Sequence, residues 1–206
     1  MRERTHALHT RAEKSGIVND ILRGKASRYG YALLLRNLLP AYQQLEAGLE
    51  FHRHSPAVSA AAHRDVYRAP AIISDLVDIS GPDWENALPL LPAGEQYGRR
   101  IATSATGDGT GLIAHAYTRY FGDLSGGQVL KRLLERSLGL QPRQLSFYEF
   151  PKIKDKELFK QSYRRAIDAG AALIADIETV VGEAMAAFEL NIAVSEAVRQ
   201  AIAAPA

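Results

Sequence analysis

Asp123 and Ser125 stand in the middle of a glycine-rich stretch at residues 117–130, Tyr-Thr-Arg-Tyr-Phe-Gly-Asp-Leu-Ser-Gly-Gly-Gln-Val-Leu. A carboxylate beside exposed backbone can orient water or accept a proton. The apolar residues on both sides have helical spacing, which predicts that the stretch lies within a helix. Each glycine costs a helix interior about 0.5–1 kcal/mol relative to alanine, so the three glycines predict a bend. A helix that tolerates them is expected to bring its backbone close to something flat or bulky.

Close packing of two helices is the main alternative explanation for Gly122 and Gly126, whose spacing of four is typical of small-residue helix contacts. It leaves Asp123 unexplained, unless that aspartate is a solvent-facing residue that weakens the helix. A membrane helix is excluded because Arg119 and Lys131 fall within the candidate span. A phosphate-binding loop is a poor fit, since no strand precedes the glycines and the G-x-x-x-x-G-K-[ST] pattern is absent.

His9 and Glu13 are four residues apart in a helical segment, so they share one face. A histidine that binds a metal usually donates its other ring N–H to a carboxylate or a carbonyl, and Glu13 could be that partner. An ordinary surface pair is the commoner explanation for such a spacing. No further histidine or acid has the spacing of a zinc site, so a metal at His9 favours one axial position on a haem iron. His115 is expected to serve in packing or hydrogen bonding.

Two groups of basic residues lie in the second half of the chain. Lys160 and Arg164 are spaced to hold a carboxylate or a phosphate together. Lys131, Arg132 and Arg136 form a basic stripe next to the glycine bend, and such a stripe could dock an acidic protein. For both groups the alternative is a solvated basic face.

Helical periodicity runs through nearly the whole chain, which predicts an all-α domain of roughly eight helices spanning residues 1–206. An apolar stripe from Leu34 to Leu49 predicts a long helix that Ser27 caps and Pro40 kinks. Gly16 is expected to end the first helix, and 146–150 to form a short extended piece. The expected helices cover residues 5–15, a long segment that Ser27 caps and that ends before Pro56, and residues 57–66, 70–79, 93–105, 112–138, 155–169 and 172–203.

Composition excludes several function classes for this 206-residue chain. The net charge of +2 gives no electrostatic case for nucleic acid as a partner. The absence of cysteine excludes disulfides, thiolate metal ligands and cysteine nucleophiles. The N-terminus lacks the apolar core of a signal peptide and no hydrophobic anchor follows the last helix, so a cytoplasmic protein without a membrane attachment is expected.

Four segments together resemble one protein family. Residues 114–131 closely resemble the signature of haem oxygenases, and Leu8-His-Thr-Arg-Ala-Glu13 is similar to the family's proximal-histidine helix. Phe159-Lys-Gln-Ser-Tyr-Arg164 and Phe188-Glu-Leu-Asn191 match two further segments. The long signature is highly specific, the others are individually weak, and their order and spacing fit the family over nearly the whole chain.

This resemblance implies a pocket in which haem b is sandwiched between a proximal helix and a kinked distal helix. His9 is then the proximal iron ligand, and Glu13 orients its ring. Gly122 and Gly126 let the distal backbone lie against the haem, and Asp123 anchors ordered water above the iron.

The resemblance also implies further contacts around the haem. The expected propionate contacts are Arg2, Tyr117, Lys160 and Arg164, and His6 stands where animal members commonly have a lysine. The expected polar network of the distal pocket consists of Tyr42, Arg119 and Asn191. Phe188 belongs to the fourth matching segment and is expected at the haem, and Ser195 replaces an aromatic residue often found in the family.

The implied activity is that of a bacterial, soluble haem oxygenase. Such an enzyme uses O2 and an external electron donor to cleave haem, here expected at the α-meso carbon, into biliverdin, carbon monoxide and ferrous iron. A ferredoxin or a flavoprotein reductase is the expected donor, docking at Lys131, Arg132 and Arg136, and a monomer is the expected state. The alternative is a non-catalytic haem carrier or sensor on the same fold.

Overall fold

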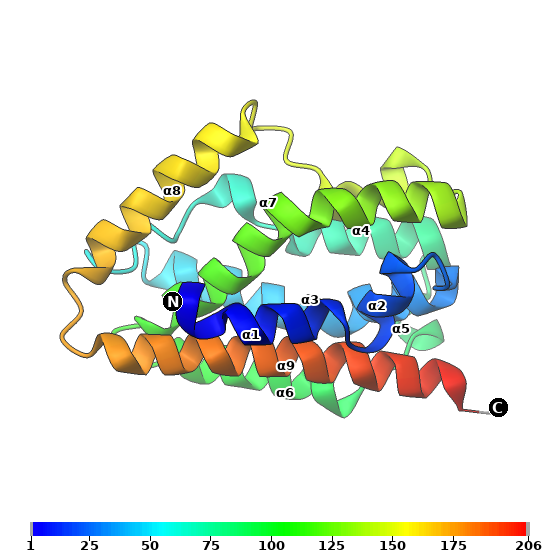
Figure 1. Ribbon diagram of the computed structural model, residues 1–206, viewed down its shortest axis with the longest axis horizontal. Helices are drawn as coiled ribbons and strands as arrows, with labels where there is room; N and C mark the ends of the chain where they lie inside the picture. Colours follow the sequence, from blue (N-terminus) through cyan, green and yellow to red (C-terminus); the bar gives the residue numbers. More distant parts are fainter. Residues whose placement is uncertain (1, 205–206) are drawn as a thin grey trace.

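Nine α-helices and three short 3-10 helices make up residues 2–204, the part of the chain that this computed structural model describes, with side chains described from residue 4 onward (Figure 1). The α-helices are α1 (Arg2–Glu13), α2 (Gly16–Leu22), α3 (Arg28–Phe51), α4 (Ala69–Ser80), α5 (Trp84–Ala87), α6 (Pro92–Ser104), α7 (Gly111–Leu138), α8 (Lys156–Ala171) and α9 (Ile177–Ala203). The 3-10 helices are η1 (Arg64–Val66), η2 (Pro142–Gln144) and η3 (Ser146–Tyr148). The predicted all-α class is therefore confirmed. Within the described residues, none of the helices combines the length and apolar character that a bilayer crossing requires.

α3 is the central helix, and it packs against α4, α6, α7 and α9. Ser27 caps it as predicted, because its hydroxyl accepts the backbone N–H of Gly30 at 3.0 Å. The helix continues through Pro40. A Cβ on Gly98 would lie only 2.9 Å from the Pro40 Cβ, so a glycine here lets α6 approach α3 closely. Buried leucine and tyrosine side chains, Tyr42 among them, anchor α3 in the core.

α7 and α1 face each other across one side of the molecule. α7 is 28 residues long, and Figure 1 shows its first half running obliquely and its second half turning to run horizontally toward the right of the view. α1 lies alongside α9 on the opposite side, and α8 leans away from the rest of the bundle (Figure 1). The predicted bend of the glycine-rich helix is visible here, although the helix is not interrupted.

The corner between α1 and α2 differs from the prediction that Gly16 ends a helix. α1 ends at Glu13, and Gly16, with a φ of +52°, begins α2. A Cβ on Gly16 would lie 2.2 Å from the backbone of Ser195 in α9, so only glycine fits. The Ser195 hydroxyl donates to the Ser15 carbonyl at 3.0 Å and accepts the Val18 N–H at 3.1 Å. Ser195 therefore holds the α1–α2 corner onto α9 and does not line the large cavity described below.

The helix predicted at 57–66 is wrong. This segment forms successive turns, with only η1 at its end, because its carbonyls serve tertiary contacts. The Tyr163 hydroxyl of α8 donates to the Ala61 carbonyl at 2.8 Å. A Cβ on Gly170, also of α8, would lie 2.5 Å from the Ala57 carbonyl oxygen. Packing against α8 thus overrides the alanine-rich helical pattern.

The extended piece predicted at 146–150 is also wrong, since η3 occupies 146–148. The buried carboxylate of Asp75 accepts the backbone N–H groups of Ser146 at 2.8 Å and Phe147 at 2.9 Å. This carboxylate holds the turn in place and leads Phe147 and Tyr148 toward the space below α7.

Candidate functional site

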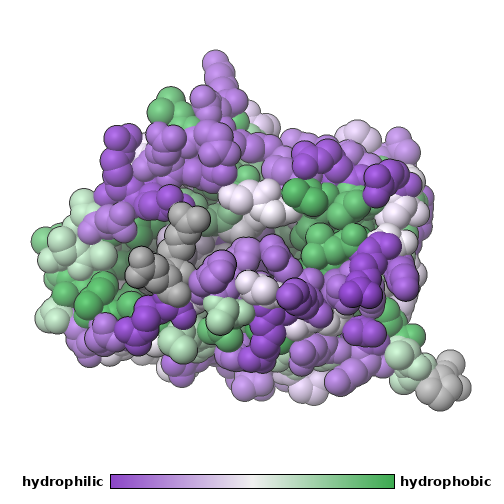
Figure 2. All heavy atoms as spheres, in the orientation of Figure 1, coloured by the Kyte–Doolittle hydropathy of each residue, from purple (hydrophilic) through white to green (hydrophobic). Residues whose placement is uncertain are grey.

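A cavity of about 590 Å³ lies between α1 and α2 on one side and α7 on the other. In Figure 2, apolar surface gathers between the edge formed by α7 and the edge formed by α1 and α2. Aliphatic and aromatic side chains supply much of its wall. Those apolar residues are Ala12, Val18, Leu22, Leu34, Leu38, Phe121, Val129, Leu130, Phe147 and Phe188. The polar residues and glycines of the wall are Thr5, His6, His9, Glu13, Tyr117, Thr118, Arg119, Gly122, Asp123, Ser125, Gly126, Gly127, Tyr148, Arg164 and Asn191.

The α1 wall presents His9 to this cavity. Its Nδ1 lies 3.7 Å from Glu13 Oε1, within ion-pair reach but longer than a hydrogen bond. The His9 ring also contacts the Phe188 ring of α9 edge-on, with the centroids 6.1 Å apart. The His9 side chain remains 56% exposed, which leaves it accessible to a ligand in the cavity. His6, one turn earlier, also lines the cavity and is exposed.

The three glycines of the α7 bend differ in what an added Cβ atom would contact. A Cβ on Gly122 or on Gly126 would meet no other atom within 4 Å, so neither glycine is explained by helix packing. A Cβ on Gly127 would lie 2.9 Å from Tyr148 Cδ1, so Gly127 permits a close contact with η3. The helix-packing alternative therefore applies to Gly127 alone among these three. The bare backbone at Gly122 and Gly126 faces the cavity.

Asp123 lies between Gly122 and Gly126, and it is the member of a buried polar network that carries the carboxylate. The Tyr42 hydroxyl donates to Asp123 Oδ2 at 2.5 Å. Arg119 Nε donates to the Tyr42 hydroxyl at 2.9 Å, and its NH2 lies 3.5 Å from Asp123 Oδ1. Arg119 NH1 also donates to Asn191 Oδ1 of α9. The structure thus brings together the predicted distal residues, although Tyr42 is fully buried behind Asp123 and does not itself line the cavity.

Burial and charge act against each other on this network. Burial raises the pKa of Asp123, while Arg119 and the hydrogen bond from Tyr42 lower it, and the pKa stays above the usual aspartate value. Burial lowers the pKa of Arg119, but Tyr42 and Asp123 outweigh it and the pKa is raised. Arg119 therefore stays positively charged. Asp123, which it holds, exchanges a proton at a higher pH than an ordinary aspartate does.

Arg68 and Glu46 form a second buried layer that the sequence reasoning missed. Glu46 Oε1 accepts the backbone N–H groups of Arg68 and, at 2.9 Å, of Ala69, which caps the start of α4. The Arg68 guanidinium lies over the Phe150 ring and donates to the Glu149 carbonyl. The positive charge of Arg68 also lowers the pKa of Asp123. A lone arginine before Ala-Pro gave no sequence signal for this position.

Glu183 joins α6, α7 and α9, and it too was missed. Its Oε1 lies 2.7 Å from His115 Nε2 and accepts the Ser104 hydroxyl at 2.8 Å, and Arg100 Nε donates to it at 2.9 Å. His115 is fully buried, which agrees with its predicted hydrogen-bonding role. The three partners lie 68–83 residues away from Glu183 in the chain, so no local pattern reveals them.

Lys160 and Arg164 do not act alike. Arg164 lines the cavity, and its guanidinium lies over the Phe121 ring at 5.1 Å. Lys160 does not line it: its Nζ contacts Ser125 Oγ at 3.2 Å and Glu157 Oε1 at 2.6 Å. Tyr117 lines the cavity as expected. The expected contact of Arg2 lies outside the described side chains.

The basic stripe near the bend is partly neutralised. Lys131 Nζ forms ion pairs with Glu135 at 2.8 Å and with Glu149 at 3.0 Å, and its side chain is only 19% exposed. Arg132 and Arg136 are exposed. The two arginines, rather than Lys131, therefore carry the available charge of this stripe.

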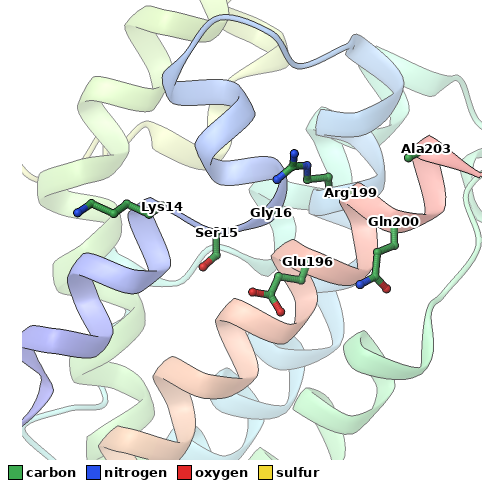
Figure 3. Close-up of a pocket in the computed structure, with 7 residues that line it drawn as sticks. All are labelled: Lys14, Ser15, Gly16, Glu196, Arg199, Gln200 and Ala203. Atoms are coloured by element: carbon green, nitrogen blue, oxygen red, sulfur yellow. The ribbon is translucent and has the colours of Figure 1, made fainter.

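A second hollow of about 340 Å³ lies where the α1–α2 corner meets the end of α9 (Figure 3). Its basic residues do not converge, because the Lys14 side chain points away from Arg199 (Figure 3). Arg199 is engaged by Asp20 at 3.4 Å. The described residues contain no group of three or more histidines and acids that could hold a metal ion. The cavity between α1 and α7 is therefore the candidate site.

Comparisons with known proteins point to one family. The family model described as "Heme oxygenase" matches residues 1–197. The chain is 38% identical to "Heme oxygenase 1" of Nostoc over 192 residues, which is 93% of this chain and 81% of the relative. It is 34% identical to "Heme oxygenase 1" of Homo sapiens over 203 residues, covering 97% of this chain and 70% of the relative.

Solved structures give the same result. Heme oxygenase-2 from Synechocystis, solved in complex with heme and NO, superposes with a TM-score of 0.91 at 34% identity, covering 98% of this chain and 84% of the other. Heme oxygenase from Leptospira interrogans gives a TM-score of 0.88 at 33% identity, covering 95% and 96%. With its full-length family match, its fold and its four matching segments, this chain belongs to the haem oxygenase family and is an enzyme of that family.

Proposed function

We propose that the cavity between α1 and α7 binds haem b as the substrate and that the chain converts it to biliverdin, carbon monoxide and ferrous iron. The observation that carries this proposal is the bare backbone of Gly122 and Gly126 on either side of a buried, hydrogen-bonded Asp123. A flat macrocycle can lie against such a surface, whereas any larger residue would fill the space.

The lining of the cavity fits a haem. A porphyrin has apolar faces and an edge with two carboxylates, and ligand pockets of this kind combine an apolar wall with a few polar groups. The wall here is largely aliphatic and aromatic, and Arg164 and Tyr117 supply polar groups. The Synechocystis relative was solved with heme, which supports the same ligand for this chain.

His9 is the residue that would hold the iron. It projects from α1 into the cavity and faces the wall that carries Gly122 and Gly126. A neutral imidazole is a common axial ligand of haem iron. Glu13, 3.7 Å from His9 Nδ1, would fix the orientation of the ring after a small adjustment.

Bound haem supplies the redox chemistry, with O2 and electrons from outside, while the protein supplies orientation and protons. Asp123 lines the cavity and its pKa is raised by burial, so it can hold a water molecule and a proton beside the reacting face. Tyr42 and Arg119 fix the carboxylate from behind, and Asn191 fixes Arg119. The close backbone at Gly122 and Gly126 excludes bulk water from the same face.

The orientation of the haem in its plane follows from its carboxylates. Arg164 and Tyr117 would bind them directly, with Lys160 joining after release from Glu157, and Arg2 would add a contact at the start of α1. His6 is placed to take part, since it lines the cavity. Residues placed in this way would hold the haem by its carboxylates on one side of the cavity, and we propose the α isomer of biliverdin as the product.

The reaction needs an external electron donor, for which an acidic ferredoxin or a flavoprotein reductase is proposed. Arg132 and Arg136 are exposed on the second half of α7, which also forms one wall of the cavity. Such a surface favours an acidic partner and makes association depend on salt. The absence of cysteine fits a reducing compartment such as the cytoplasm, and a monomer is proposed because it is the family's usual form.

Haem titration followed by turnover tests this proposal. A one-to-one complex should form, and a reductant in air should bleach its Soret band and produce a bile-pigment band that chromatography identifies as biliverdin. In His9→Ala the iron–histidine signal in resonance Raman spectra should be lost, while His54→Ala, on a histidine outside the cavity, serves as the matched control. Haem binding without bile pigment, or an unchanged iron–histidine signal in His9→Ala, would contradict the proposal.

A further inference from the structure

α1 carries His9 but has almost no buried surface of its own. Among its described side chains, Thr5 alone is buried, while Leu8 and Ala12 are half-buried. The helix rests mainly on α9. A short helix with so little apolar burial is held only weakly and can detach locally while the core stays folded.

Polar contacts with α9 take the place of an apolar face. Arg11 donates through both guanidinium nitrogens to Glu189, NH1 to Oε1 at 2.9 Å and NH2 to Oε2 at 2.6 Å. Arg4 approaches Glu178 at 3.5 Å. A bidentate arginine–carboxylate pair defines direction as well as distance, so the Arg11–Glu189 pair limits both sliding and rotation of α1 on α9.

The Arg11–Glu189 ion pair lies next to the contact between His9 and Phe188. Arg11 follows His9 by two residues, and Glu189 follows Phe188, whose ring meets the His9 ring at 6.1 Å. The ion pair and the ring contact therefore lie side by side at the same point of the α1–α9 contact. A displacement of α1 from α9 that separates Arg11 from Glu189 would therefore also change the contact between His9 and Phe188.

We propose that Arg11 and Glu189 are a positioning pair that holds His9 against the cavity and thereby slows the release of haem. This inference rests on the proposed function, in which His9 is the iron ligand. Both side chains are about half exposed, at 52% and 47%, so the pair is screened by salt and is not essential for folding. Its effect is expected on the local opening of α1 rather than on the stability of the core.

Charge reversal and charge exchange give the test. Haem-loaded protein is mixed with excess apomyoglobin, and the rate of haem transfer is followed by absorbance. Arg11→Glu and Glu189→Arg should each accelerate transfer about two- to ten-fold, and the double exchange should restore a rate close to the original one. The matched control is Arg99→Glu, because Arg99 pairs with Glu95 on the exposed face of α6 at 3.1 Å. That variant should leave the rate unchanged.

Salt gives a second arm that does not depend on charge reversal. Arg11→Gln, which removes the charge without reversing it, should also accelerate haem transfer. At about 1 M salt, where the Debye length is about 3 Å, the original protein should approach the rate of that variant. Equal transfer rates in the original protein and in both reversals, or a double exchange no better than the single reversals, would overturn the positioning role. Loss of the iron–histidine signal in His9→Ala together with such equal rates would leave the proposed function standing and remove only this inference. Absence of haem binding in the original protein would overturn both.

Discussion

The Tyr42 hydroxyl donates to Asp123 Oδ2 at 2.5 Å, and Arg119 Nε donates to that hydroxyl at 2.9 Å. A fully buried phenol on α3 thus links a charged guanidinium to the only carboxylate on the α7 wall of the described cavity. Because this hydrogen bond lowers the pKa of Asp123 against the effect of burial, it sets how readily the carboxyl group holds a proton.

Tyr42→Phe removes that donor and should raise the pKa of Asp123 further. The carboxylate form is then present only at higher pH, so the pH at which turnover changes should move upward, and turnover below that pH should fall. A pH profile of biliverdin formation measures this effect. Tyr29→Phe, on an exposed tyrosine of the same helix, is the control. A profile in Tyr42→Phe identical to that of the original protein would show that the hydroxyl has no such influence.

The three glycines of the α7 bend, Gly122, Gly126 and Gly127, should not respond alike to alanine. Gly122→Ala and Gly126→Ala meet no protein atom, so each should stabilise the haem-free protein by about 0.5–1 kcal/mol while weakening haem binding. Gly127→Ala places a Cβ 2.9 Å from Tyr148, so it should destabilise the haem-free protein by about 1–3 kcal/mol. Thermal unfolding and haem titration measure the two quantities. If all three variants were less stable than the original protein, close helix packing would explain Gly122 and Gly126 as well.

Arg164 and Lys160 should differ in their influence on the product. Arg164 lines the cavity, whereas Lys160 is held by Ser125 and Glu157 outside it. Arg164→Gln is therefore expected to yield the α isomer of biliverdin together with other isomers. Lys160→Gln should yield a smaller proportion of those other isomers than Arg164→Gln does. Chromatography of the products gives the ratio. Pure α isomer from Arg164→Gln would contradict the proposed orientation of the haem.

Glu183 should govern stability in acid. Burial raises its pKa, but the hydrogen bonds from His115, Arg100 and Ser104 outweigh burial and bring the pKa to about 2, compared with an ordinary value of 4.5. The unfolded chain therefore binds the proton first, so this stabilisation is complete above about pH 4.5 and is lost as the pH falls toward 2.

Glu183→Gln should consequently lower the free energy of unfolding at neutral pH by about 1–3 kcal/mol and flatten its decline in acid. Urea unfolding at several pH values measures both. Glu178→Gln removes a carboxylate that is 70% exposed on the same helix and should change neither. An unchanged acid slope in Glu183→Gln would mean that other carboxylates govern this range.

Local patterns were enough to predict much of the fold and of the site. The helical spacing of apolar residues predicted α3, α6 and α7 closely, because each buries a continuous stripe. His9 and Glu13 could be paired from their spacing alone, and the cost of three glycines in one helix predicted a close approach. These are all effects within one helix.

Effects between helices could not be predicted in the same way. The helix expected at 57–66 fails because Tyr163 takes the Ala61 carbonyl, and η3 forms because Asp75 captures two backbone N–H groups. Ser195, expected near the haem, instead bonds the α1–α2 corner. Each of these contacts joins residues that are more than 70 positions apart, so only the folded chain brings them together.

The most direct test of the account is the biliverdin yield of Asp123→Ala under a reductant in air, measured on protein whose haem binding has been verified by titration. The carboxylate is fixed by Tyr42 and Arg119 beside the bare backbone of α7, so its removal should leave haem bound through His9 and abolish most biliverdin formation. A yield equal to that of the original protein would contradict the role assigned to Asp123.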